Sequence, residues 1–99
     1  MTKLQAQDEH AQMVRQAFAA CDGLEHLRVR RRADLLVVES GEVDDPIPHA
    51  RFRRLAGQVW VLEMATHTGR WQPSGERGLL EELAHMLIHD FGWTLTRIV

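Results

Sequence analysis

Three histidines occupy positions whose spacing could bind a metal ion. His85 and His89 are four residues apart in an apolar-periodic segment, so on a helix they stand one turn apart, and His67 could add a third ligand. No glutamate follows His85, so the metalloprotease motif His-Glu-x-x-His is missing. Two histidines on the polar face of a helix are the simpler interpretation. We therefore predict no bound metal and no other cofactor, and keep a small metal- or ligand-binding protein built on these three histidines as an alternative function.

A second group of residues has the types needed for acid–base chemistry. Glu63 and His67 lie an even number of residues apart, so both project from one face of a strand, where His67 could act as a base. Arg53 or Arg70 could then bind an anion. The sequence contains no nucleophile motif, no glycine-rich phosphate loop after a strand and no pair of acids in a definable cleft. We therefore predict no catalytic residues and no enzyme activity.

Arginine is concentrated in two short stretches. RVRRR at 28–32 and RFRR at 51–54 hold seven of the twelve basic residues, a density suited to binding phosphates. A nucleic-acid-binding regulator is therefore another alternative function. The competing interpretation is that these arginines form cross-strand pairs with Glu39 and Glu63, or only a solvated face. No aromatic side chain is expected to stack bases among them.

Length and composition indicate the class of protein. The 99 residues predict one domain spanning 1–99, and 44% hydrophobic and 26% charged residues are ordinary for a globular protein. A formal net charge of −2 excludes a strongly basic or strongly acidic chain. The longest apolar run, Leu35–Val38, is far too short to span a bilayer, and 1–20 lack the apolar centre of a signal peptide. The lone Cys21 excludes an internal disulfide. We predict a cytoplasmic protein with no membrane contact.

The first two thirds of the chain predict a helix followed by strands. Apolar residues recur with helical spacing over 4–21. Residues 26–32 alternate between apolar and charged, whereas 34–40 form the continuous apolar run typical of a central strand. The segment 41–49 carries two prolines and three acids, which predicts a loop. Residues 50–66 predict a hairpin that turns near 56–58.

The last third predicts a second helix and a final strand. Gly78 is the expected N-cap, with Glu81 at the third helical position, and an apolar stripe continues over 79–91. Gly92 ends this helix, and 93–99 can add a short strand. The predicted order is α-β-β-β-β-α-β. The fold class is therefore α+β, with a single antiparallel sheet of four to five strands and two helices mainly on one face.

The predicted strands divide into two faces because successive side chains alternate. The face that we expect the helices to cover holds Leu27, Val29, Leu36, Val38, Phe52, Trp60, Leu62 and Met64. The opposite face holds Arg28, Arg30, Arg51, Arg53, Glu39, Glu63 and His67 around Leu35, Val37, Leu55, Val59 and Val61. Two helices cannot easily cover both faces, so the second face predicts an apolar patch with an arginine rim, as at partner-binding surfaces. Alternatively, the first helix or the C-terminal segment lies across it.

Two tryptophans flank the second helix. Trp93 is predicted to pack in the core, with its indole N–H bonded to a loop carbonyl. Trp71 stands beside Arg70 on a predicted turn, where it is either a similar anchor or an exposed interface residue. Both interpretations of Trp71 stay open.

These observations predict a non-catalytic protein-interaction module, such as a small accessory, regulatory or immunity-type subunit, acting through the exposed sheet face. Apolar residues on both faces of neighbouring strands further predict self-association as a homodimer, because a twofold contact would cover them. The predicted partner is thus a protein or a second copy, with nucleic acid as the weaker alternative. The candidate partner-binding residues are Arg28, Arg30, Arg51, Arg53, Val37, Val59, Val61, Glu63, His67, Arg70 and Trp71.

Overall fold

The computed structural model describes residues 5–66 and 68–95, apart from the side chains of 93 and 94. In chain order the elements are helix α1 (Asp8–Ala19), strands β1 (Arg28–Arg32), β2 (Leu35–Glu42), β3 (Asp45–Ala56), β4 (Val59–Ala65) and β5 (Trp71–Gly78), helix α2 (Leu80–Asp90) and the short 3₁₀ helix η1 (Gly92–Leu95). The five strands form one antiparallel sheet in sequence order, each paired with the next along the chain. The predicted fold class, an α+β domain with a single antiparallel sheet and two helices, is confirmed.

The predicted order α-β-β-β-β-α-β is wrong in the position of the fifth strand. That strand is β5, which precedes α2, so the observed order is α-β-β-β-β-β-α. The strand β5 was not predicted because it contains Pro73 and Gly75, and both residue types are depleted in strands. They are tolerated here because β5 is an edge strand that pairs only with β4. Of the strand predicted at 93–99, residues 93–95 belong instead to the 3₁₀ helix Gly92–Leu95, and 96–99 lie outside the described residues.

The predicted loop at 41–49 is also wrong. β2 and β3 continue through this segment as a long hairpin, in which Glu42 pairs with Asp45. The pairing of β3 with β4 extends only as far as Ala50, so 45–49 have β2 as their one paired neighbour. A proline in such a segment removes no hydrogen bond to a second strand, which explains why Pro46 and Pro48 are accommodated.

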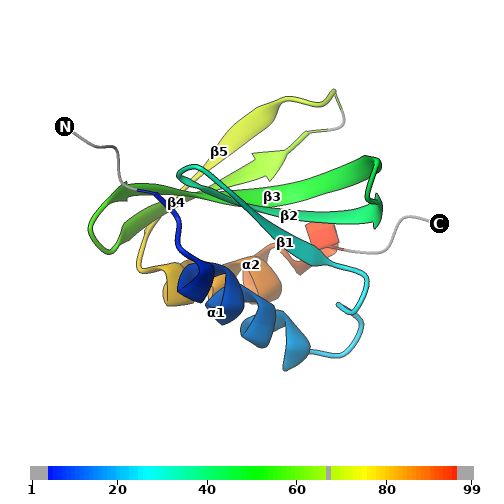
Figure 1. Cartoon of the computed structure of the whole chain (residues 1–99), viewed down its shortest axis with the longest axis horizontal. Coiled ribbons are helices and arrows are strands. Elements are labelled where there is room, and N and C mark those ends of the chain that lie inside the picture. The colour runs from blue at the N-terminus through cyan, green and yellow to red at the C-terminus, as the bar shows by residue number, and fades with distance from the viewer. Residues whose placement is uncertain (1–4, 67, 96–99) are drawn as a thin grey trace.

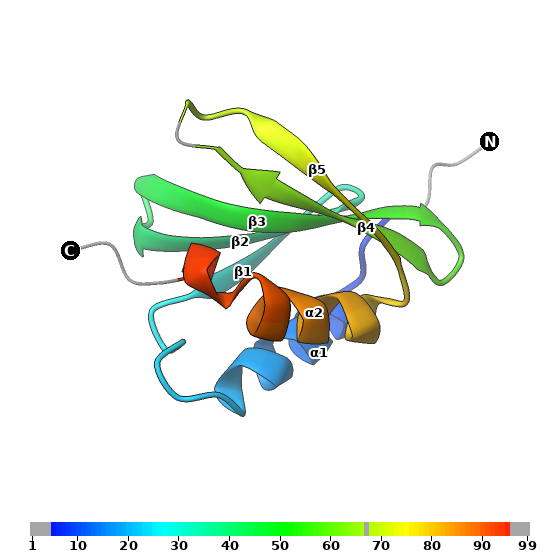
Figure 2. The same cartoon turned by 180° about the vertical axis from the view of Figure 1, so that it is seen from behind.

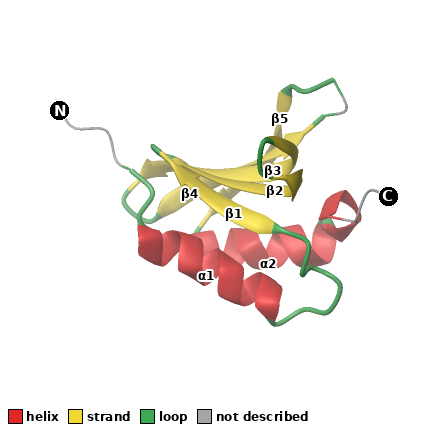
Figure 3. Cartoon of the chain, turned by 45° about the vertical axis from the view of Figure 1, so that its right-hand side comes forward, coloured by secondary structure: helices red, strands yellow, loops and turns green. Residues whose placement is uncertain are grey.

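Both helices lie against the same face of the sheet (Figures 1 and 2). Buried residues recur along each helix at spacings of three and four: in α1 they are His10, Ala11, Val14 and Phe18, and in α2 Leu80, Leu83, Ala84 and Leu87. Figure 3 shows the helices together beneath the strands, with β5 on the far side from them. The described chain places no helix on the opposite face of the sheet.

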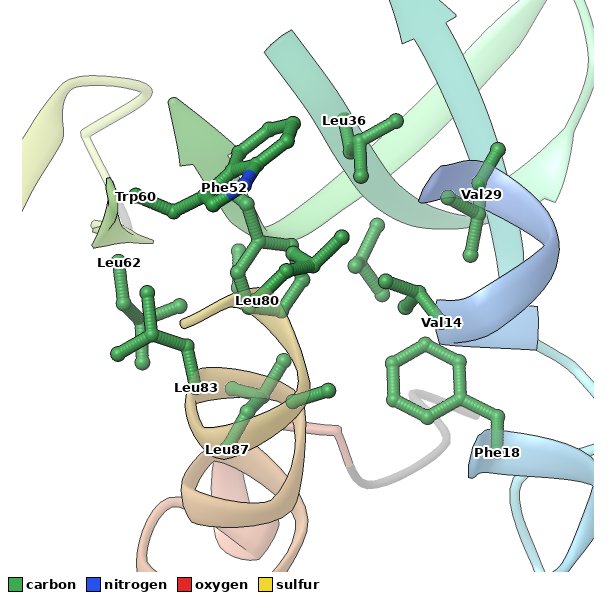
Figure 4. Packing of buried hydrophobic residues seen from close by; sticks show 14 of the residues in the cluster. Val14, Phe18, Val29, Leu36, Phe52, Trp60, Leu62, Leu80, Leu83 and Leu87 are labelled. Carbon is green, nitrogen blue, oxygen red and sulfur yellow. The ribbon is translucent and has the colours of Figure 1, made fainter. Parts of the chain in front are cut away.

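The core lies between the helices and the sheet, as predicted. Figure 4 shows Phe52 and Leu62 pointing from the strands toward the leucines of α2, with Val29 beside α1. The Trp60 ring lies 5.0 Å from that of His10 in α1. Six of the eight residues predicted for this face are buried: Val29, Leu36, Val38, Phe52, Trp60 and Leu62. Leu27 and Met64 are partly buried and pack against the same cluster. The predicted assignment of strand faces is therefore confirmed on the helical side.

Both helices begin at different residues from those predicted. The first was predicted over 4–21 and spans Asp8–Ala19. The N-cap of α2 is Leu79 rather than Gly78, because Gly78 is still paired with Trp60 in the sheet. The third helical residue is accordingly Glu82, and its carboxylate accepts the backbone N–H of Leu79 at 3.3 Å.

Candidate binding surface

The face of the sheet that the helices leave uncovered, called the open face below, is rich in arginine. Strand pairing places six arginines and two glutamates on it: Arg28, Arg30, Arg32, Arg51, Arg53, Arg77, Glu39 and Glu63. These eight residues have a formal charge of +4. Because the whole chain has a net charge of −2, the rest of the molecule has a formal charge of −6. The open face is therefore more positive than the rest of the molecule taken together.

The two glutamates of the open face are paired within the chain. The Arg51 Nε donates to Glu63 Oε1 at 2.7 Å, and the Arg53 guanidinium donates to the same oxygen at 3.1 Å. The Arg30 Nε donates to Glu39 Oε1 at 3.0 Å. The Glu39 side chain is only 7% exposed, and that of Glu63 only 15%, so each carboxylate depends on its arginine for solvation. The cross-strand pairs that the sequence offered as one interpretation are present.

The apolar centre of the open face is smaller than predicted. Val37 was expected to lie exposed, but it is only 6% exposed because Arg30 and Arg51 flank it on the neighbouring strands. Val61 is half-buried, whereas Val59 is 40% exposed. The remaining apolar surface therefore lies toward β4 and the turn before it.

Trp71 belongs to the open face rather than to a turn. It opens β5 opposite Ala65, and the Arg51 guanidinium carbon lies 4.3 Å from the centre of its ring. A guanidinium at this distance makes a cation–π contact. The expectation that no aromatic side chain lies among the arginines is therefore wrong. Strand β5, which the sequence did not predict, brings Trp71 there.

A shallow groove of about 350 Å³ runs along the open face between β1, β2, β3 and Trp71. Its apolar lining comes from Ala33, Leu35, Val37, Pro46, Pro48 and Trp71, and its charged lining from Arg30, Arg32, Arg51 and Glu39. This volume falls in the lower part of the range of small-ligand pockets. The groove combines apolar contact area with guanidinium donors at its border.

The predicted acid–base group is only partly assembled. Glu63 and Arg53 do meet, but as an ion pair. Arg70 is exposed in the turn between β4 and β5, which the Thr66 hydroxyl stabilises by accepting the Arg70 N–H at 3.2 Å. His67, the proposed base and third metal ligand, lies outside the described residues. The described part of the chain therefore shows no histidine beside Glu63.

The predicted histidine pair has the expected geometry on α2. The rings of His85 and His89 are exposed, and their centres lie 4.1 Å apart. Among the described residues, no group of three or more histidine, cysteine or acidic side chains is arranged to hold a metal ion. Of the three histidines proposed as metal ligands, His85 and His89 are therefore adjacent, and His67 lies outside the described residues.

The structure contains a serine–histidine pair that the sequence did not indicate. Ser40 Oγ and His49 Nε2 are 2.7 Å apart, and the two residues are 5% and 4% exposed. A histidine beside a serine is the arrangement of an activated nucleophile, but such a nucleophile must reach its substrate. Burial makes a structural role the better interpretation. The sequence did not indicate this pair because 41–49, which contains His49, was predicted as a loop and not as a strand beside Ser40.

A larger hollow of about 570 Å³ lies between the end of α1 and β1. Phe18, Leu24 and Leu27 line it together with Arg15 and Arg28. Both arginines already donate to backbone carbonyls, Arg15 to Val29 at 2.8 Å and Arg28 to Gly41. The guanidiniums therefore brace β1 and the β2–β3 hairpin.

Trp93, predicted as a core residue, lies in η1, but its side chain is outside what the structure describes.

The described helices include none long and apolar enough to cross a membrane. No family model matches the chain, and no curated protein or solved structure matches it. The function must therefore be inferred from the open face itself.

Proposed function

We propose that the protein is a non-catalytic interaction module that docks a partner protein on the open face. The observation that carries this proposal is the one-sided fold: both helices cover one face of the sheet, and the described chain places no helix on the other. Half-buried and exposed aliphatic side chains, among them Val59 and Val61, remain on that uncovered face. Contact with a partner would remove them from water.

The side chains of the open face suit a protein interface. Arginine and tryptophan are the residue types that most often dominate binding energy. Trp71 lines the groove and is held in place by Arg51, so it loses little conformational freedom on binding. The ion pairs of Glu39 and Glu63 fix the surrounding arginines in the same way. The surface is thus organised before a partner arrives.

A non-catalytic role is supported by the state of the chemically capable groups. Both carboxylates of the open face are paired with arginines, and the Ser40–His49 pair is buried.

The proposal keeps the cytoplasmic location expected from the single cysteine, Cys21, which is free.

The proposal favours a different protein over a second copy as the partner. Two open faces in a twofold contact would bring together two surfaces that each have a formal charge of +4. Glu39 and Glu63, the acidic residues of the open face that could pair with arginines of a second copy, are already paired within the chain. Self-association remains a prediction that the mass in solution tests.

Nucleic acid is the second candidate partner, and one observation favours it. Trp71 lies among the arginines of the open face, where an aromatic ring could stack on a base. The ring face toward Arg51 is already occupied by the guanidinium. The buried carboxylate of Glu39 and the partly buried one of Glu63 also lie on this surface and would repel phosphates.

Affinity capture from the source cells with two matched variants tests the proposed function. Val61→Arg places a bulky side chain on the open face without reducing its positive charge, and Met13→Arg adds the same side chain on α1, where Met13 is 40% exposed. We expect the wild type and Met13→Arg to retain a protein that Val61→Arg loses. Thermal unfolding shows whether both variants are folded. Identical sets of captured proteins from all three would contradict docking on the open face.

A further inference from the structure

We propose that the occupant of the open face is an acidic segment of the partner protein that carries one apolar anchor side chain and crosses the strands. This inference rests on the proposed function and adds the chemistry of the partner. Its first support is charge. The charged residues of the open face have a formal charge of +4 in a molecule with a net charge of −2, so an acidic segment is attracted to this face in preference to the rest of the surface.

The second support is a row of arginines across the sheet. Strand pairing aligns Arg32, Leu35, Arg53, Val61 and Arg77, one residue from each strand. The side chains of Arg32 and Arg77 are exposed, and no ion pair or hydrogen bond joins either side chain to another described residue. The free guanidiniums therefore stand at the two edges of the sheet, with the partly exposed Arg53 between them.

The spacing of this row fits an extended acidic chain. Arginines on alternate strands are separated by two strand spacings, about 9.6 Å. A chain in the polyproline II conformation brings every third residue to the same side, about 9.3 Å further along. Carboxylates at every third residue would therefore meet Arg32, Arg53 and Arg77 in turn. Arg53 would donate from Nη1, because its Nε and Nη2 already bond to Glu63. Leu35 and Val61 lie between these arginines. There they would contact the backbone of the bound segment or one of its apolar side chains.

The third support is the groove beside the row. It has a volume of about 350 Å³, Leu35, Pro48 and Trp71 form part of its apolar lining, and Arg30 and Arg32 stand at its border. An apolar side chain placed here would have carboxylates on either side of it within reach of the guanidiniums. The arrangement suits an anchor residue flanked by acids.

The surface fits a protein segment better than a nucleic acid. In the middle of the face, each arginine near a glutamate is already neutralised, as in the pairs of Arg30 with Glu39 and Arg51 with Glu63. A nucleic acid would place a continuous line of phosphates over these carboxylates, whereas a peptide can place neutral residues there. Preferential binding of nucleic acid would therefore contradict the proposal.

Fluorescence anisotropy with defined probes tests this inference on the full chain. The first probe is a labelled peptide, Glu-Pro-Leu-Glu-Pro-Pro-Glu, which has an acid at every third position and one apolar anchor. The same peptide with glutamine for glutamate tests the charge, and with alanine for leucine it tests the anchor. A single-stranded oligothymidylate of fifteen nucleotides tests nucleic acid. Each titration is repeated at low and high salt.

The variants are matched in charge. Arg32→Glu and Arg77→Glu each change the net charge by −2 on the open face, and the double substitution Gln12→Glu with Gln16→Glu makes the same change at exposed positions of α1. We expect the acidic peptide to bind the wild type more tightly than either peptide control. Each arginine variant should bind it about fivefold more weakly, as the loss of one exposed ion pair and the gain of a repulsive charge require. The α1 variant should bind like the wild type.

Three outcomes overturn the inference. If the acidic peptide does not bind, or binds no better than its glutamine form, the occupant is not acidic, although docking on the open face still stands when Val61→Arg loses its captured protein. If the oligothymidylate binds more tightly than the peptide and loses affinity in the same arginine variants, nucleic acid is the ligand. If the α1 variant weakens peptide binding as much as Arg32→Glu does, the attraction comes from net charge and not from this surface.

Discussion

The two faces of the same sheet differ in what their side chains do. On the helical side, Leu36 and Phe52 are fully buried and pack in the core. On the open face, their strand neighbours Val37 and Arg51 contribute to a charged surface with a groove. Adjacent positions of one strand therefore lie in different environments, because the side-chain direction alternates along the backbone. Substitutions in the core should change stability, and substitutions of exposed side chains on the open face should change binding.

The largest effect is expected in the core. Phe52→Ala and Trp60→Ala each remove a large side chain that is 0–1% exposed, and should lower the free energy of unfolding by about 3 to 5 kcal/mol. That loss is a large part of the total stability of a small domain, so either variant should be unfolded or nearly so. Urea denaturation followed by circular dichroism measures it. Leu55→Ala, at a position near the end of β3 that is 46% exposed, is the control and should cost less than about 0.5 kcal/mol.

A smaller effect is expected from breaking an ion pair of the open face. Arg30→Ala leaves Glu39, whose side chain is 7% exposed, without its cation and should cost about 1 to 3 kcal/mol. Arg32→Ala is the matched control on the same strand, because Arg32 is exposed and has no ion pair among the described residues. Its effect on stability should stay within about 0.5 kcal/mol. Equal losses in the two variants would show that the Glu39 pair does not stabilise the fold.

A still smaller effect is expected from pH at the start of α1. Burial lowers the pKa of His10 below its ordinary value of 6.5, and the positive charge of Arg54 lowers it further. Its Nδ1 also accepts the backbone N–H of Gln7 at 2.9 Å, a bond that protonation of that atom would break. As the pH falls below about 6.5, the unfolded chain binds the proton first, so this contribution to stability is present at neutral pH and lost in mild acid.

The variant His10→Gln separates this effect from other titrations. Glutamine at the third helical position can still accept the Gln7 N–H, but it does not titrate. We expect the fall in stability between pH 7 and pH 5 to be shallower in His10→Gln than in the wild type. Gln12→Asn, at an exposed position of α1 that does not titrate, should keep the wild-type slope. The same slope in all three proteins would exclude His10 as the cause.

The smallest effect is expected for self-association of the protein through its open face. Light scattering at micromolar concentration and low salt should give the mass of a monomer, since two faces of formal charge +4 repel each other. Added salt should increase any self-association by screening that repulsion. A dimer at low salt that Val61→Arg splits into folded monomers would instead establish the homodimer predicted from the sequence, and would replace the acidic segment as the occupant.

Part of the candidate site followed from the sequence. The alternation of Arg51, Phe52 and Arg53 was enough to place the arginines on one face and the phenylalanine in the core, and the structure agrees. Trp71 could not be placed in the same way. Its strand contains Pro73 and Gly75, which favour a turn when judged by local propensity alone. The groove that it lines was therefore absent from the prediction.

The sequence by itself determined the two helices, the hydrophobic core and the face to which most strand residues belong, because these depend on periods of 3.6 and 2 residues along the chain. Only the tertiary structure decided where the fifth strand lies, that Glu63 bonds both Arg51 and Arg53, and that Trp71 packs on Arg51. An edge strand with weak propensity forms because its neighbour supplies hydrogen-bond partners, and a carboxylate is shared by whichever guanidiniums the strand register brings within reach. Both depend on contacts between segments far apart in the chain, which local patterns do not encode.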